Sequence, residues 1–314
     1  MALLLQYTLI FASVLLLVAL GGCFAERSGI VNIGLEGIMV IGALGGALAM
    51  KFIPVSVGGP VMIFATILAS ALSGMIYSLL LAIPAINFNA DQTITGTAMN
   101  ILATAAATVA VKAMNTASSG GSNVSSEISY IQQKDFFIVR MGQFEFNWFM
   151  VVAVVALIVG YILLYKTRFG LRMRACGEHP QAADSVGINV YKMRYAGTLI
   201  SGLLGGLGGI VFITAGVSVW KFEYGVSGFG FLALAVMIFG AWHPVKIALA
   251  ALLFGFFRAL GNVYSGFDFM KALNLPSYVY NMLPYIVSLI VLALTSKKSR
   301  APKAEGIPYD KGSR

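Results

Sequence analysis

Charged residues are scarce in this chain of 314 residues, because only 11% are Asp, Glu, Lys or Arg while 59% are hydrophobic. A soluble domain carries about 25% charged residues, so this chain has too few charges to cover a surface that faces water. A single soluble core also rarely reaches this length before the chain splits into domains. The composition therefore excludes an ordinary soluble protein and predicts one that crosses a membrane several times.

Residues that carry catalytic and cofactor chemistry are also few. The two cysteines, Cys23 and Cys176, cannot build a disulfide framework. The two histidines, His179 and His243, lie far apart in the sequence and lack the spacing of metal ligands. The sequence contains neither a G-x-x-x-x-G-K-[ST] phosphate loop nor a G-x-S-x-G nucleophile motif. The chain is therefore not predicted to be an enzyme, to hydrolyse ATP by itself or to hold a cofactor.

Basic residues are in excess, with 21 Lys and Arg against 12 Asp and Glu. Six of them lie between residues 166 and 194, and six more lie in the tail 297–314. Because these clusters follow apolar segments, they indicate cytoplasmic loops rather than a nucleic-acid-binding surface. Residues 114–146 are then expected outside the membrane.

Apolar segments of about 20 residues are long enough to cross a bilayer as helices. The sequence predicts an all-α polytopic membrane protein with about nine transmembrane helices, within a range of 8–10. Residues 1–296 would form the transmembrane domain and 297–314 a basic cytoplasmic tail. Two glycine-rich stretches, 29–49 and 225–255, are compatible with an inverted repeat. The predicted spans are 3–24, 33–52, 60–83, 94–113, 147–165, 195–217, 228–242, 245–264 and 279–296.

The stretch "SGIVNIGLEGIMVIGALGG" at 28–46 places polar residues inside an apolar segment. Asn32 and Glu36 are four residues apart and share one face if the segment is helical. Acids within a membrane usually face a bundle interior or an aqueous path, so both residues are candidates for lining a solute path. The alternative is structural: the pair caps a broken helix, or Glu36 bonds to Arg27.

A second polar stretch, "NFNADQTITGTAMN" at 87–100, precedes and enters the span 94–113. Asp91 and Gln92 stand just before this span, and Thr97 and Asn100 follow on one predicted helical face. Gln92, Thr97 and Asn100 would line the same path. Otherwise they form a helix cap followed by hydrogen bonds between helices.

The long basic loop "RFGLRMRACGEHPQAADSVGINVYKMR" at 168–194 contains a predicted two-turn helix. Pro180 suits its first turn and Gly187 its end. We expect a partner to receive this helix, although a helix that rests on anionic lipid is an alternative. The small apolar face would be Ala182, Ala183 and Val186, and the acids Glu178 and Asp184 would pair with bases of that partner.

Together these segments resemble the permease subunits of ATP-binding-cassette importers of the ribose, branched-chain amino acid and nucleoside type. The likeness is carried by "SGIVNIGLEGIMVIGALGG", "NADQTITGTAMN", "GEHPQAADSVGINV" and "SGFGFLALAVMIFGAWHPVKIALAALLFGFFRALGN", and the last is similar to nucleoside-uptake permeases. The resemblance implies a path through broken helices lined by Asn32, Glu36, Gln92, Thr97, Asn100 and the aromatic Phe229. It also implies docking on the ATPase through Glu178, His179, Pro180, Ala182, Ala183, Asp184 and Val186.

The resemblance further implies partners and a location. It implies a cassette ATPase that binds ATP and Mg²⁺, a second permease subunit in a heterodimer, and an extracytoplasmic substrate-binding lipoprotein, all at a bacterial plasma membrane. The implied substrate is a nucleoside, with a simple sugar such as ribose as the alternative. Two other classes compete: an ion-coupled secondary transporter that uses Glu36, and a membrane enzyme that acts on lipids.

Overall fold

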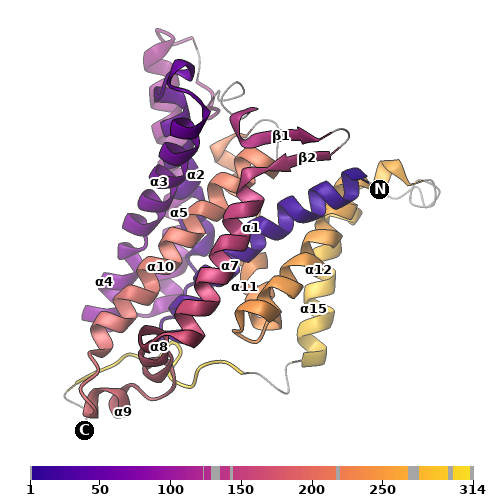
Figure 1. Ribbon diagram of the computed structural model, residues 1–314. Helices are drawn as coiled ribbons and strands as arrows, with labels where there is room; N and C mark the ends of the chain where they lie inside the picture. Colours follow the sequence, from indigo (N-terminus) through magenta and orange to yellow (C-terminus); the bar gives the residue numbers. More distant parts are fainter. Residues whose placement is uncertain are drawn as a thin grey trace.

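The computed structural model describes residues 2–122, 124–128, 135–141, 144–216, 220–267, 276–295 and 300–311. The chain forms a bundle of helices with one short hairpin at one end (Figure 1). The helices and strands in chain order are α1 Ala2–Arg27, α2 Leu35–Phe52, α3 Gly59–Tyr77, α4 Leu79–Asn87, α5 Gln92–Ser118, β1 Ile138–Met141, β2 Phe144–Asn147, α7 Trp148–Lys166, α8 Arg168–Glu178, α9 Pro180–Ser185, α10 Val190–Val211, α11 Phe229–Phe239, α12 Pro244–Val263, α14 Ser277–Asn281 and α15 Leu283–Thr295.

Helix α1 lies at the centre of the bundle. It packs against α10 and α12 most extensively, and against α7 and α11 as well. Its 26 residues are apolar almost throughout, and at 1.5 Å per residue they extend about 39 Å, which exceeds the hydrocarbon thickness of a bilayer. A helix that is hydrophobic all round is a buried one, which explains this central position.

Glycines allow α2 and α10 to touch along their backbones. A Cβ atom at Gly42 would collide with the Cα atom of Gly206, and one at Gly46 would lie 2.6 Å from the Cδ1 atom of Ile210. On the other side of α2, a Cβ atom at Gly45 would collide with the side chain of Ser73. Small residues permit such close approach where lipid supplies no hydrophobic drive. Gly42, Gly45 and Gly46 are therefore packing positions of α2.

Seven helical segments within the described residues are long and apolar enough to cross a membrane, with α3 and α4 counted as one. The predicted span 228–242 is wrong as a full crossing. In its place lies α11, whose 11 residues extend about 16 Å, roughly half of a bilayer. Left-handed residues end this helix on both sides: Ser227 and Gly228 before it, Ala241 and Trp242 after it. The predicted span 279–296 corresponds to α14 and α15.

The two basic segments lie at the same end of the bundle, as predicted. Helices α8 and α9 stand beside the C-terminal segment (Figure 1), and the N–H of Ala304 donates to the carbonyl of Gly177 at 2.8 Å. The opposite end carries the hairpin, in which β1 pairs antiparallel with β2, with Ile138 opposite Asn147. This hairpin is the departure from an otherwise helical architecture within the described chain.

Candidate functional site: a polar cluster where two helices begin

Glu36 lies in the first turn of α2 and reaches the start of α11. Its Oε1 accepts a hydrogen bond from the N–H of Gly228 at 2.8 Å, and its Oε2 accepts one from the N–H of Gly230 at 2.7 Å. The first N–H groups of a helix have no partner within it and carry partial positive charge, so a carboxylate stabilises them. Glu36 is 9% exposed. It therefore caps the half-length helix α11 from within the protein, whereas Arg27 pairs with Glu178.

The glycines that receive Glu36 are required by the geometry. Gly228 has a φ of +78°, a left-handed conformation that glycine adopts without steric cost. At Gly230, a Cβ atom would collide with the backbone nitrogen of Glu36. The sequence "GFG" at 228–230 thus lets a carboxylate approach the backbone.

Residues between α1 and α2 have no regular structure, yet they lie among the membrane helices. Irregular backbone at such depth needs hydrogen-bond partners. Helix α5 supplies these partners. The Oε1 of Gln92 accepts from the N–H of Val31 at 2.7 Å, and the Nδ2 of Asn100 donates to the carbonyl of Ile33 at 3.0 Å. The Oδ1 of Asn100 also accepts from the N–H of Gly37, in the first turn of α2, at 2.8 Å.

Asn32 continues this polar cluster toward α10. It is fully buried, and its Nδ2 donates to the Oγ of Ser201 at 2.8 Å. Among the described residues, the Oδ1 of Asn32 and the Nε2 of Gln92 have no hydrogen-bond partner although both are buried. Buried polar atoms are normally paired, so these two offer one acceptor and one donor to a water or a solute.

The remaining candidates for the path lie apart from this cluster. Thr97 is on the exposed face of α5 and its Oγ1 donates to the carbonyl of Thr93 in its own helix. Phe229 is fully buried, with its ring 4.6 Å from that of Phe212 and 5.6 Å from that of Phe11, measured between centroids. The structure therefore brings together Asn32, Glu36, Gln92 and Asn100, and leaves Thr97 and Phe229 outside.

The sequence analysis missed two residues, one beside Asn32 and one beside Phe229. Ser201, the partner of Asn32, stands in the glycine-rich start of "SGLLGGLGG", where nothing sets it apart. Arg258 could have been found from the sequence, because it is a lone base inside an apolar span. Its guanidinium carbon lies 5.4 Å from the ring centroid of Phe229, and its Nη1 donates to the Oδ1 of Asn281 at 3.3 Å.

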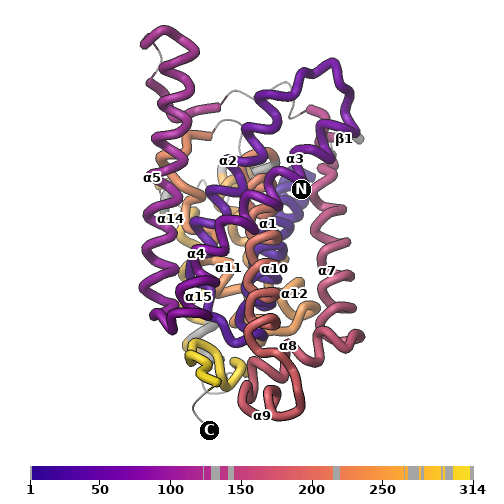
Figure 2. The backbone as a smooth tube through the Cα atoms, turned by 90° about the vertical axis from the view of Figure 1, so that its left-hand side faces the viewer, coloured from indigo at the N-terminus to yellow at the C-terminus, as the bar shows by residue number. Residues whose placement is uncertain are grey.

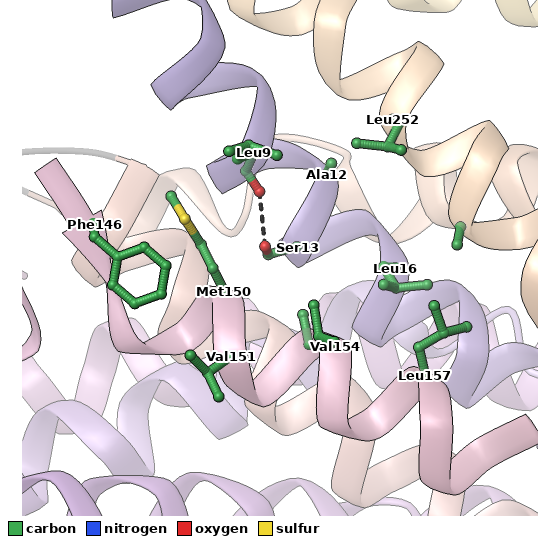
Figure 3. A pocket seen from close by; sticks show the side chains of 12 residues that line it. Leu9, Ala12, Ser13, Leu16, Phe146, Met150, Val151, Val154, Leu157 and Leu252 are labelled. Atoms are coloured by element: carbon green, nitrogen blue, oxygen red, sulfur yellow. Dashed lines mark hydrogen bonds between the residues drawn. The ribbon is translucent and has the colours of Figure 1, made fainter. Parts of the chain in front are cut away.

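An apolar cavity of about 500 Å³ lies elsewhere, between α1, α7 and α12 (Figure 3). The hydroxyl of Ser13 turns toward its own helix and donates to the carbonyl of Leu9 at 2.7 Å. The other labelled side chains around the cavity are apolar. A cavity without free polar groups cannot bind a polar solute by hydrogen bonds, so it is a poor candidate for the transported molecule.

The predicted helix of the basic loop exists as α9, Pro180–Ser185, directly after α8. Its faces differ from the prediction. Ala183 is only 4% exposed and packs inward against Cys176, Val190 and Tyr309, whereas Val186 is 74% exposed. Ala182 and Ser185 also face outward. Ala183 therefore cannot form one surface with Val186, because the loop uses it to pack against its own protein.

The matches to known proteins cover nearly the whole chain. Residues 4–293 match the family model described as the branched-chain amino acid transport system / permease component. The chain belongs to this permease family. A guanosine ABC transporter permease protein of Bacillus subtilis is 41% identical over 98% of this chain and 96% of its own length. Two nucleoside ABC transporter permease proteins of Lactococcus lactis match at 39% identity, over 96% of this chain and 95% of the relative, and at 24%, over 93% and 83%.

In this permease, a short route joins the basic loop to the polar cluster. Nη1 of Arg27 lies 3.6 Å from Oε1 of Glu178 in α8, and Asn32 is the fifth residue after Arg27. Arg27 also donates to the carbonyl of Trp242, just beyond α11. No group of three or more His, Cys, Asp or Glu gathers as a metal site in the described part of the permease.

Proposed function

We propose that this multi-pass membrane protein is the permease subunit of an ATP-binding-cassette importer and that it carries nucleosides such as guanosine. The observation that carries the proposal is the full-length similarity, at 41% and 39% identity, to permease proteins named for guanosine and nucleosides. Import into the cytoplasm of a bacterium would place it in the plasma membrane, with both basic segments inside by the positive-inside rule.

The polar cluster supports a substrate with many hydrogen-bonding groups. Among the described residues, Asn32 just before α2 holds an unpaired acceptor and Gln92 at the start of α5 an unpaired donor. A nucleoside or a ribose could use both, since each offers donors and acceptors. The sugar alternative predicts that the base contributes nothing to uptake.

The exposed face of α5 is evidence for a second permease subunit, which would form the other wall of the path. This outward face of α5 carries Thr97 and the small residues Ala98 and Ala105 beside the large apolar side chains of Ile101 and Leu102, all exposed. The small residues leave room on this apolar face for side chains of another helix. Because Lactococcus lactis has two permease proteins that match this chain at different identities, we infer a heterodimer of two related chains.

The remaining partners follow from the division of labour in such an importer. A cassette ATPase would bind ATP and Mg²⁺ and contact the outward face of α9, and a lipoprotein would deliver substrate at the hairpin end. Both oxygens of Glu36 already accept N–H groups of α11, which disfavours the ion-coupled alternative in which Glu36 binds the driving ion. About nine crossings and an inverted repeat remain part of this proposal.

Uptake by cells tests the proposed substrate. Cells that express the permease with its proposed partners (the second permease subunit, the ATPase and the lipoprotein) should accumulate labelled guanosine, and cells without the permease should not. An excess of unlabelled adenosine should compete, and ribose at the same concentration should not. Competition by ribose alone would establish the sugar alternative, and uptake that survives loss of the ATPase would overturn the importer class.

A further inference from the structure

The C-terminal segment 300–311 is bound to the end of the bundle that carries α8 and α9 (Figure 2). The N–H of Ala304 donates to the carbonyl of Gly177 at 2.8 Å, and the N–H of Gly306 donates to that of Gly29 at 3.3 Å. The Nη2 of Arg194, a fully buried residue of α10, donates to the carbonyl of Ile307 at 2.9 Å. The segment thus connects α8, the turn after α1, and α10.

Tyr309 gives the segment an apolar contact with α9. It is 3% exposed and packs in one cluster with Cys176, Ala183 and Val190. Its ring also lies 5.5 Å from that of Tyr191. A helix of six residues has too few internal hydrogen bonds to persist by itself, so α9 depends on this packing for its position.

Two carboxyl groups meet where the segment reaches α1. Glu305 stands between Ala304 and Gly306, which bond to Gly177 and Gly29, and its carboxyl group interacts with that of Glu26. Glu26 is 4% exposed, and its Oε2 accepts from the indole Nε1 of Trp242. The Oε2 of Glu305 is buried without a hydrogen-bond partner among the described residues. Two carboxylates in contact cannot both be ionised without strong repulsion, so such a pair shares a proton.

The nearby bases are committed elsewhere. Arg27 donates to the carbonyl of Trp242 and pairs with Glu178 of α8, and Arg194 donates to Ile307. His243 stands next to Trp242, and its pKa is lowered by burial, by Lys246 of α12 and by Arg27. Within the described residues, neither Glu26 nor Glu305 makes an ion pair. A proton shared between the two carboxyl groups would therefore relieve their repulsion.

Burial raises the pKa of the Glu305 carboxyl to about 7, against the opposing effects of the Glu26 hydrogen bond and of Arg27. Detached from the bundle, the segment would carry Glu305 near its ordinary pKa of 4.5. Attachment then takes up a proton. It is strongest below about pH 4.5, weakens as the pH rises toward about 7, and stays weak above that.

We propose that segment 300–311 is a strap that seats α9 on the membrane domain, and that a proton shared by Glu26 and Glu305 fastens it. The strap rests on the proposed function only in that α9 is the contact for the ATPase. A seated α9 transmits motion between ATPase and membrane helices, and a loose one does not. The strap therefore makes that contact responsive to cytoplasmic pH.

Hydrogen exchange of the full-length permease in lipid nanodiscs tests the strap. The amides of 300–311 are followed at about pH 5.5 and about pH 8, with a synthetic peptide of the same residues correcting for intrinsic exchange. We expect about tenfold stronger protection at the lower pH, a value discounted for the partial exposure of Glu305. Glu305→Gln, which is neutral at every pH, should show strong protection at both values. Lys303→Gln, a change at an exposed charge of the same segment, should keep the wild-type pH dependence.

Equal protection of the wild-type segment at both pH values would overturn the strap, and so would an unchanged pH dependence in Glu305→Gln. If the Glu305→Gln permease does not insert into the membrane, Glu305→Ala tests the same point. In that variant, protection of 300–311 should be weak and independent of pH. The readout needs neither substrate nor nucleotide. Failure of the strap therefore leaves the transport proposal standing, and failure of guanosine uptake leaves the strap standing.

Discussion

The carboxylate of Glu36 lies 2.7 Å from the backbone nitrogen of Gly230, so the start of α2 holds the start of α11 in place. The other end of α11 is held by Trp242, whose carbonyl accepts from Arg27 and whose indole donates to Glu26. A half-length helix fastened at both ends moves with the elements that hold it. This arrangement links the end that carries α8 to the polar cluster.

Removing the charge of Glu36 should impair transport. Glu36→Gln keeps the shape but places an NH₂ group against an N–H of α11, and it loses a charge–dipole interaction of about 1–2 kcal/mol. We expect guanosine uptake to fall about tenfold at equal permease level in the membrane. Glu223→Gln is the matched control, because Glu223 is partly exposed and its ion pair among the described residues is with Lys112 at 3.6 Å. Equal uptake in the two variants would contradict a role for the cap.

Asn100 and Thr97 should separate stability from transport. Asn100→Ala leaves the N–H of Gly37 and the carbonyl of Ile33 without partners, which costs about 1–3 kcal/mol and lowers the Tm of the purified permease. Thr97→Ala removes an exposed hydroxyl, so the free energy of unfolding should change by less than about 0.5 kcal/mol while uptake falls. Normal uptake in Thr97→Ala would remove Thr97 from the path, and an unchanged Tm in Asn100→Ala would mean that water replaces the amide.

The two sides of α9 should respond differently to a bulky charge. Val186→Arg alters an exposed position, so the permease should fold normally and retain less ATPase in affinity purification. Ala183→Arg forces a charge into the cluster around Tyr309 and should reduce the amount of folded permease itself. Val124→Arg, at an exposed valine of the opposite end, serves as the control. Full ATPase retention in Val186→Arg would move the contact to another surface.

The proposed orientation predicts which cysteines an impermeant maleimide can reach in intact cells. The native Cys23 and Cys176 are buried and give little background. Ser122→Cys should be labelled because the proposed orientation places 114–146 outside, and Ser185→Cys in α9 should be labelled only after the cells are opened. Labelling of Ser185→Cys in intact cells would invert the topology.

Much of the fold was predictable because a membrane imposes strict demands on a sequence. Only long apolar helices satisfy their own backbone in lipid, so most of the predicted spans became helices, and the two basic clusters lie at one end as predicted. The site was predictable in residue type but not in contact. Asn32, Glu36, Gln92 and Asn100 stood out as polar groups in apolar surroundings, and all four meet around the start of α2.

What only the tertiary structure decided depends on contacts between distant residues. Gly228 lies 192 residues from Glu36. Its N–H needs a partner because α11 begins there, and no local sequence pattern predicts that this partner is Glu36. The same holds for Ala183, whose inward side is set by Tyr309 of the tail. Composition and periodicity determine which solvent a segment enters and how it coils. Which buried donor finds which acceptor is determined by how the helices pack, because only packing brings the two atoms within 3 Å.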